Sequence, residues 1–290
     1  MREVFECIPC YITQVVNLFN LVGVDEEAAR KHMRSILLTI ASLDPQRIPA
    51  ENVTVILHKV NELLGNQDPY RRVKQESNTL ALGMLPKLRE IVNCSNDPLY
   101  TACKLAVAGN IIDMILLPDF DIDASIEEAL SWEFVGKDYK VFKKQVESAR
   151  QILIVGDNSG EIAIDRLLVE QLRRPDNKIL YAVKGGPIIN DATMEDAEQV
   201  GMVGEVKLIT NGNNSVGTNL ELCSLEFCQA MAESDVIISK GQANYESLES
   251  TIEYRDKIFF LLRAKCSVTA QKLGVKLNGM VLQWNGSSQE

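Results

Sequence analysis

The sequence is poor in histidine and in aromatic residues, and it has no long apolar run. Histidine occurs twice in 290 residues, and phenylalanine, tryptophan and tyrosine together make up 6%. No segment approaches the roughly 18 uninterrupted apolar residues of a membrane-spanning helix, which argues against a membrane protein. Glu3, Glu6 and Pro9 come too early for a secretory signal, so a cytosolic location is expected.

Basic residues are scarce relative to acidic ones. The chain has 30 lysines and arginines against 40 aspartates and glutamates, which gives a formal net charge of −10. No nucleic-acid partner is expected, because phosphate backbones require a broad basic surface, although a local basic pocket is compatible with this charge. Hydrophobic residues are plentiful at 46%, and the length allows two folded domains.

The seven cysteines do not form a disulfide or zinc pattern. An odd number in a long chain without a secretory signal argues against a disulfide scaffold. Cys7 and Cys10 form a Cys-x-x-Cys pair at the start of the first helix, but a second cysteine or histidine pair at metal spacing is missing. A redox pair would follow a strand, so structural cysteines or a shared metal are favoured. The other cysteines are expected in the core or on helices: Cys94, Cys103, Cys223, Cys228 and Cys266.

The two halves of the chain have different hydrophobic patterns. Residues 1–148 carry apolar residues at helical spacing and lack strand-like runs, which predicts a helical N-terminal domain. Residues 149–290 alternate short apolar runs with helical patterns, which predicts an α/β domain whose parallel sheet is covered on both faces. The expected helices of the first domain are 12–22, 26–43, 50–64, 70–93, 98–114 and 125–130. The expected strands of the second are 152–155, 179–183, 206–209, 236–239, 258–262 and 280–284.

The stretch 152–161 carries the clearest functional signal. An apolar strand ends in Asp157 and Asn158, and a Ser-Gly turn then leads into an amphipathic helix. Ligands of open α/β sheets bind beyond the carboxyl ends of the strands, and a helix N-terminus favours anions. A hard cation on the two side-chain oxygens, with a phosphate beside it, is the simplest ligand set for this place. The stretch is not a Walker loop, because no Gly-Lys-Ser/Thr follows.

Polar residues follow each of the first five predicted strands, and a parallel sheet would gather them at one edge. Asp157, Asn158 and Asp191 would offer three oxygen ligands, which suits Mg²⁺ or Mn²⁺. Lys240 and Lys265 would hold phosphate oxygens. Glycines 185, 186 and 241 would let backbone N–H groups approach an anion. The convergence favours a single site at this edge.

Simpler interpretations exist for parts of this pattern, and the chemistry has two versions. Asp191 is also a good N-cap for the helix predicted at 192–200, and residues 158–160 can be an ordinary turn. A bound metal would polarise a phosphoryl group and orient an attacking water. Alternatively, Asp157 or Asp191 would attack and form an acyl phosphate.

The motifs resemble those of the damage-control phosphatases, a metal-dependent family formerly catalogued as domain of unknown function 89. The resemblance covers nearly the whole chain and includes the Cys-x-x-Cys pair of the prokaryotic branch. In the second half it rests on residues 157–161, 190–193, 240–246 and 263–266. In the first half it rests on residues 7–10, 68–70, 74, 78 and 108–113.

The resemblance implies a hydrolase of phosphate esters, with sugar phosphates and phosphopantetheine-type metabolites as substrate classes. It also implies a helical N-terminal domain followed by a Rossmann-like α/β/α domain, and Mn²⁺, Ni²⁺, Co²⁺ or Mg²⁺ as the cation. Asp157, Asn158 and Asp191 would be the metal ligands, with the two aspartates catalytic. The substrate-binding residues would be Glu161, Lys240, Asn244 and Lys265.

Two polar pairs in the helical half, and two rival functions, complete the sequence-based hypotheses. Lys74 with Asn78, and Asn110 with Asp113, each share one helix face. The resemblance favours a position in a cleft, while buried hydrogen bonds between helices are the alternative.

The rival functions are an S-adenosylmethionine-dependent carboxyl methyltransferase and a phosphometabolite-binding protein without turnover. Residues 155–160 loosely imitate the glycine-rich turn of such methyltransferases. The oligomeric state is not predicted.

Overall fold

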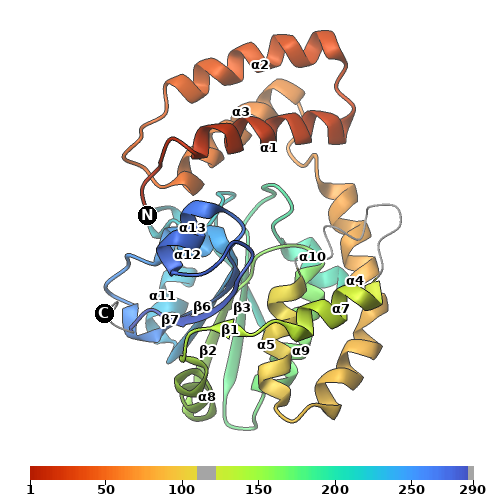
Figure 1. Cartoon of the computed structure of the whole chain (residues 1–290), viewed down its shortest axis with the longest axis vertical. Helices are drawn as coiled ribbons and strands as arrows, with labels where there is room; N and C mark the ends of the chain where they lie inside the picture. Colours follow the sequence, from red (N-terminus) through yellow and green to blue (C-terminus); the bar gives the residue numbers. More distant parts are fainter. Residues whose placement is uncertain (110–121, 287–290) are drawn as a thin grey trace.

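The computed structural model describes residues 1–109 and 122–286, which form helices around a seven-stranded sheet (Figure 1). The helices before the sheet's main strands are α1 (Cys7–Val22), α2 (Glu26–Ala41), α3 (Pro49–Leu64), α4 (Arg71–Cys94), α5 (Pro98–Ala108), α7 (Ile122–Ser131) and α8 (Tyr139–Ser148). The later helices are α9 (Glu161–Leu172), α10 (Met194–Gln199), α11 (Leu225–Glu233), α12 (Gln242–Leu248) and α13 (Ser267–Leu273), with 3-10 turns η2 (Leu220–Leu222) and η3 (Arg255–Lys257). The strands are β1 (Phe134–Val135), β2 (Gln151–Val155), β3 (Lys178–Val183), β4 (Lys207–Thr210), β5 (Val236–Lys240), β6 (Ile258–Arg263) and β7 (Met280–Trp284).

The sheet is mainly parallel, as predicted, and its strand order is β1-β7-β6-β5-β2-β3-β4. All six predicted strands form, and β7 alone among them runs antiparallel to its neighbour β6. Helix α13, which lies between these two strands, has seven residues, as does α12 between the parallel strands β5 and β6, so the length of the helix does not account for the reversal. The two-residue strand β1, paired with β7, was not predicted because it is too short to show a period.

Helices cover both faces of the sheet because the strands are apolar on both sides. In β2, Ile152 and Ile154 join the hydrophobic cluster that includes residues of α4, α5 and α9, while Leu153 and Val155 join the cluster of α11 and α12. This alternation follows from the two-residue period of a strand. The β2 side chains of both sets are almost fully buried, so the centre of the sheet is the core of this part of the chain.

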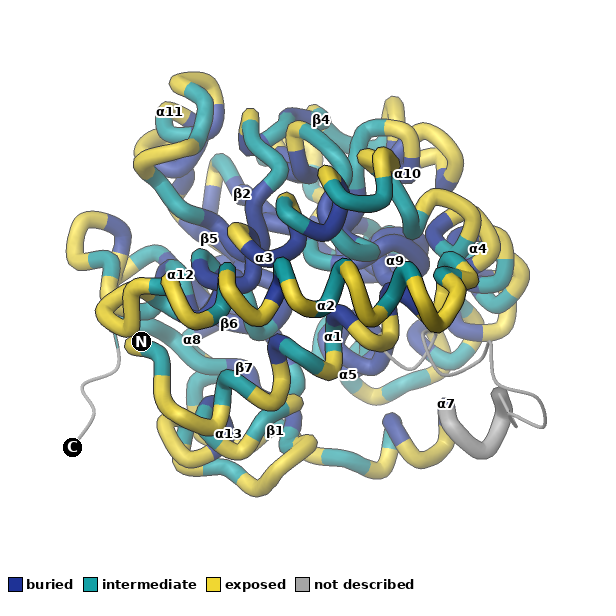
Figure 2. The backbone as a smooth tube through the Cα atoms, turned by 90° about the horizontal axis from the view of Figure 1, so that it is seen from above, coloured by how far each residue is buried: buried dark blue, intermediate teal, exposed yellow. Residues whose placement is uncertain are grey.

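Helices α1–α3 form a separate hydrophobic cluster above the sheet edge at which α12 and α13 lie (Figure 1). Ile188 and Val216, from the loops after β3 and β4, pack into this cluster. Viewed from above, α2 is the outermost helix and one of its sides is exposed (Figure 2). In contrast, α4 and α5 share a core with the sheet. The division of the chain into domains 1–148 and 149–290 stays a prediction.

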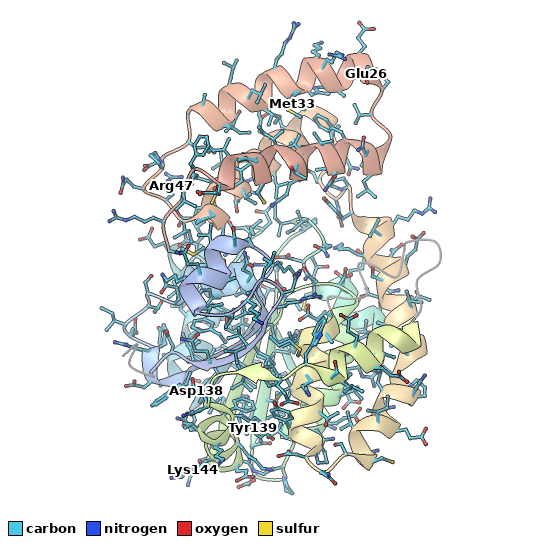
Figure 3. All side chains as sticks on the ribbon, viewed as in Figure 1. Glu26, Met33, Arg47, Asp138, Tyr139 and Lys144 are labelled. Carbon is cyan, nitrogen blue, oxygen red and sulfur yellow. The ribbon has the colours of Figure 1, made fainter. Side chains whose placement is uncertain are left out.

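The helix ends follow local sequence signals. The Asp25 side chain caps α2 by accepting a hydrogen bond from the Ala28 N–H group, and Gly23 and Gly65 end α1 and α3 in the left-handed conformation. Glu26, the first residue of α2, lies at the opposite end of the molecule from α8, where Asp138, Tyr139 and Lys144 are labelled (Figure 3). Short turns therefore separate long helices where the sequence changes from apolar spacing to Gly, Asp and Pro.

Some sequence-based expectations can be compared only in part. The residues Asn110 and Asp113, and the end of the helix expected at 98–114, lie outside the described residues. Within the described ranges, no helix combines the length and the apolar character that crossing a membrane requires.

Candidate active site

Asp157 lies where the winding of the sheet reverses. The chain passes from β2 outwards through β3 and β4, and then continues in β5 on the other side of β2. Ligands of open α/β sheets bind beyond the carboxyl ends of the two strands at such a switch point. Gly241, directly after β5, has a φ of 81°, and a Cβ at this position would overlap the carboxylate of Asp157. The loops after β2 and β5 thus approach each other as closely as a glycine allows.

We expect Gly241→Ala to lower the free energy of unfolding by about 2–4 kcal/mol, because it adds backbone strain and a collision with Asp157. The measurement is urea denaturation of the purified protein. Gly204→Ala is the matched control, because Gly204 has a φ of 84° but open space around its Cβ position. The control should lose only about 1 kcal/mol from strain. Equal losses in the two variants would contradict the collision.

Backbone hydrogen bonds bring Asp191 to the same place. The Ala192 N–H donates to the carbonyl of Asp157 at 2.9 Å, and the Ser159 N–H donates to the carbonyl of Asn190 at 2.8 Å. The loop after β3 is therefore fastened along the loop after β2. The N-cap of α10 is Thr193, so the interpretation of Asp191 as a simple helix cap is wrong. This leaves the Asp191 carboxylate beside Asp157 and Asn158, as the sequence predicted.

A cavity of about 340 Å³ lies between this sheet edge and the helices α1 and α3. Asp157, Asn158 and Asp191 line it, together with Lys265 from the loop after β6. Four of the sequence-predicted site residues thus meet in one cavity. The remaining wall consists of Met1, Glu6, Cys7, Cys10, Tyr11, Gln14, Pro49, Ala50, Val53, Ile189, Asn190, Val216, Gln242, Ala243, Glu246, Cys266, Ser267 and Val268.

The pKa values of the two cavity aspartates are raised above the ordinary value of an aspartate. Burial raises the pKa of Asp191 to about 7, opposed mainly by the charge of Lys184 and reinforced by Asp157. Burial also raises the pKa of Asp157, and the charge of Lys265 opposes this rise more than that of any other residue. A buried carboxylate, that of Asp191, and a half-buried one, that of Asp157, line the same cavity and favour a cation between them.

Lys240 does not line the cavity but lies behind it. Its ammonium is fully buried and donates hydrogen bonds to the carboxylates of Glu161 and Asp165, the latter at 2.7 Å. Asp165 in turn accepts a 2.6 Å hydrogen bond from the Tyr181 hydroxyl. Burial lowers the pKa of Lys240, but the two carboxylates outweigh it and raise the pKa above its usual value. Lys240 is therefore a cation held within the protein core, next to the Asp157 loop.

Asn244 and the glycine N–H groups are also used within the protein. The Asn244 amide donates to the carbonyls of Gly156 (3.1 Å) and Lys240 (2.8 Å), which ties the ends of β2 and β5 together. The Gly185 N–H donates to the Asn213 carbonyl, and the Gly241 N–H donates to the Leu261 carbonyl. The expectation that the N–H groups of Gly185 and Gly241 hold an anion is therefore wrong. Both positions are glycine because two backbones, or a backbone and a carboxylate, approach closely.

Lys74 and Asn78 fasten α4 to the site from outside the cavity. Lys74 pairs with Asp196 at 3.2 Å, and the Asn78 amide donates to Asp196 at 2.9 Å. The Asn78 oxygen accepts the Gly160 N–H at 2.6 Å, just before α9. Neither residue lines the cavity, so the buried hydrogen-bond alternative is the one observed.

Several residues in or beside the cavity had not been assigned to the site from the sequence. Cys266, expected in the core or on a helix, lines the cavity together with Cys7 and Cys10. Glu246 lies at the wall, where burial raises its pKa. The buried ammonium of Lys184 forms an ion pair with Asp191 at 3.3 Å. The signal that marks Lys184 is its position directly after β3, among the polar residues that follow the strand, but the sequence assigned a role only to the glycines after it.

The donor set fits a hard divalent cation better than a soft one. Asp157, Asn158 and Asp191 present two carboxylates and an amide on one wall, which leaves room for water and phosphate oxygens in the coordination sphere. Within residues 1–109 and 122–286, no group of three or more histidine, cysteine, aspartate or glutamate side chains gathers as a metal site. Cys7 and Cys10 therefore do not complete a zinc site with other described residues of these types.

Comparison with known proteins gives consistent matches along the chain. A model of the damage-control phosphatase ARMT1-like domain matches residues 4–281. An uncharacterised protein of Methanocaldococcus jannaschii is 35% identical over 288 residues, covering 96% of this chain and 93% of that protein. A damage-control phosphatase of Pyrococcus horikoshii is 33% identical over 288 residues, with 98% and 99% covered. The crystal structure of a DUF89 family protein from Pyrococcus horikoshii matches with a TM-score of 0.89 at 33% identity, covering 98% of this chain and 99% of that one.

The fold and the site define an α/β protein with a cavity that carries Asp157, Asn158 and Asp191 at the switch point of a mainly parallel sheet. The chain belongs to the damage-control phosphatase ARMT1-like domain family. The resemblance on which the sequence analysis relied is thereby confirmed, and the protein is a member of a phosphatase family.

Proposed function

We propose that this protein is a metal-dependent phosphatase that hydrolyses small phosphorylated metabolites, such as sugar phosphates or phosphopantetheine-like compounds. The observation that carries the proposal is the gathering of Asp157, Asn158, Asp191 and Lys265 around one cavity. The first three residues would hold the cation, in a site where the raised pKa values of the two carboxylates favour a nearby positive charge. Mn²⁺, Ni²⁺, Co²⁺ or Mg²⁺, when bound, supplies Lewis-acid polarisation of the phosphoryl group.

The chain's own residues divide into those that meet the substrate and those that hold them. The exposed side chain of Lys265 lies at the cavity, where its charge would bind phosphate oxygens. Direct substrate contact by Glu161, Lys240 and Asn244 stays a prediction. Their burial and mutual bonds support instead a role in fixing the loops that carry Asp157.

The first experiment is phosphate release from a panel of sugar phosphates and phosphopantetheine, in EDTA and after each divalent cation is restored. We expect no release in EDTA and recovery with at least one of the four cations, because both aspartates need a counter-cation to act together. If folded protein releases no phosphate with any cation, the proposal is wrong. Methyl transfer from S-adenosylmethionine and metabolite binding without turnover would then be measured as the two rival functions.

A further inference from the structure

One face of α3 grips the loop that follows β4. Residues 51, 54 and 58 of α3 lie on one side of the helix by its 3.6-residue period. The contacts are those of Glu51 Oε1 with Asn219 Nδ2 (2.8 Å), Thr54 Oγ1 with the Val216 N–H (2.9 Å) and His58 Nε2 with the Asn214 carbonyl (3.1 Å). We call residues 213–219 the gripped loop. The outer helices are thereby attached to a segment that is remote from them in sequence.

The gripped loop reaches the candidate active site through its other side. The Gly217 carbonyl accepts a hydrogen bond from the ammonium of Lys184, which also pairs with Asp191 Oδ2 at 3.3 Å. The Thr218 hydroxyl donates to Asn244 Oδ1 at 2.7 Å. A single short loop therefore connects α3 to a cavity carboxylate through Lys184.

The loop has little freedom at the point where it holds Lys184. Gly217 has a φ of 72°, and a Cβ at this position would lie 2.6 Å from the Ala243 carbonyl and would overlap the Ser247 hydroxyl. Lys184 itself is 4% exposed, so its ammonium has no bulk water as an alternative partner. One oxygen of Asp191 is thus fixed from behind, which sets the direction of the carboxylate toward the cavity.

We propose that Lys184 is a positioning residue for Asp191, and that the grip of α3 on residues 213–219 holds it in place. The cation affinity of the cavity then depends on how α1–α3 are positioned against residues 213–219. This inference rests on the proposed function, because it takes Asp157, Asn158 and Asp191 as the cation ligands. It extends that function by linking the outer helices to metal binding.

The test is Mn²⁺ binding to the full chain without substrate, measured from the electron paramagnetic resonance signal of free Mn²⁺. Lys184→Met should raise the dissociation constant by about tenfold or more, because partners that orient a metal ligand carry this much of the affinity. Thr54→Val keeps the side-chain shape but removes the acceptor of the Val216 N–H, and should raise the constant by about fivefold. Melting curves recorded on the same samples separate loss of fold from loss of binding.

Thr39→Val is the matched control for Thr54→Val. Each threonine hydroxyl donates to the carbonyl four residues earlier in its helix, that of Ser35 or Ala50, but Thr39 lies on α2, away from the gripped loop. The control should bind Mn²⁺ as the wild type does. An unchanged constant in Thr54→Val overturns the inference even if Lys184→Met does not fold. If the wild type binds none of Mn²⁺, Ni²⁺, Co²⁺ and Mg²⁺, measured by isothermal titration calorimetry, the proposed metal site is overturned and the inference with it, so the two failures are distinguishable.

Discussion

Replacing Asp157 with alanine is expected to abolish metal-stimulated phosphate release while the protein stays folded. The rate should fall by more than about a hundredfold, since loss of even an indirect partner of a metal ligand costs 10–100-fold in affinity or activity. The fold should not suffer, because burial raises the pKa of this carboxylate and its charged form therefore opposes folding at neutral pH. Phosphate release and thermal melting of the same preparation provide the measurement.

Asp191→Ala should behave in the same way, because Asp191 lies on the same cavity wall and its pKa is also raised by burial. Asp176→Ala is the control, as its side chain is 78% exposed and pairs with Arg174 at the surface. Full activity in purified Asp157→Ala or Asp191→Ala would refute the assignment of these residues. Loss of activity in the control would point to a general effect of removing an aspartate.

Lys240→Met is expected to be the most destabilising of these substitutions, by about 3–5 kcal/mol in the free energy of unfolding. It leaves the carboxylates of Glu161 and Asp165 buried without their cation. Lys265→Met is the comparison, because this lysine is exposed at the cavity and its loss should change stability by no more than about 0.5 kcal/mol. Denaturant unfolding and steady-state kinetics of both variants make the measurement.

The kinetic result separates the two lysines further. Lys265→Met should raise the KM for phosphorylated substrate, since its charge lies at the cavity. A stable Lys240→Met variant with a raised KM would instead show that Lys240 contacts substrate, as its position at a strand end suggested. Destabilisation by Lys240→Met without a matching effect in Lys265→Met supports the buried ion cluster.

The contrast between these lysines shows what the sequence alone does not reveal about the surroundings of each ammonium group. Lys240 is the last residue of β5, so the two-residue period places its side chain on the same face as Ile238, toward α9. Lys265 follows β6 by two residues and lies in the loop beyond the sheet edge. The useful signal for Lys240 was the pair Glu161 and Asp165, two acids four residues apart in an otherwise apolar stretch of helix.

The sequence by itself determined most of the helices, every strand except β1, the mainly parallel sheet and the meeting of Asp157, Asn158 and Asp191 at one sheet edge. These follow from local hydrophobic periods and from the rule that parallel strands end on the same side. Only the tertiary structure decided that β7 is reversed, that Lys240 is buried, and that α1 and α3 complete the cavity. Such outcomes depend on which side chains from distant segments fill the same space, and a local pattern carries no information about that packing.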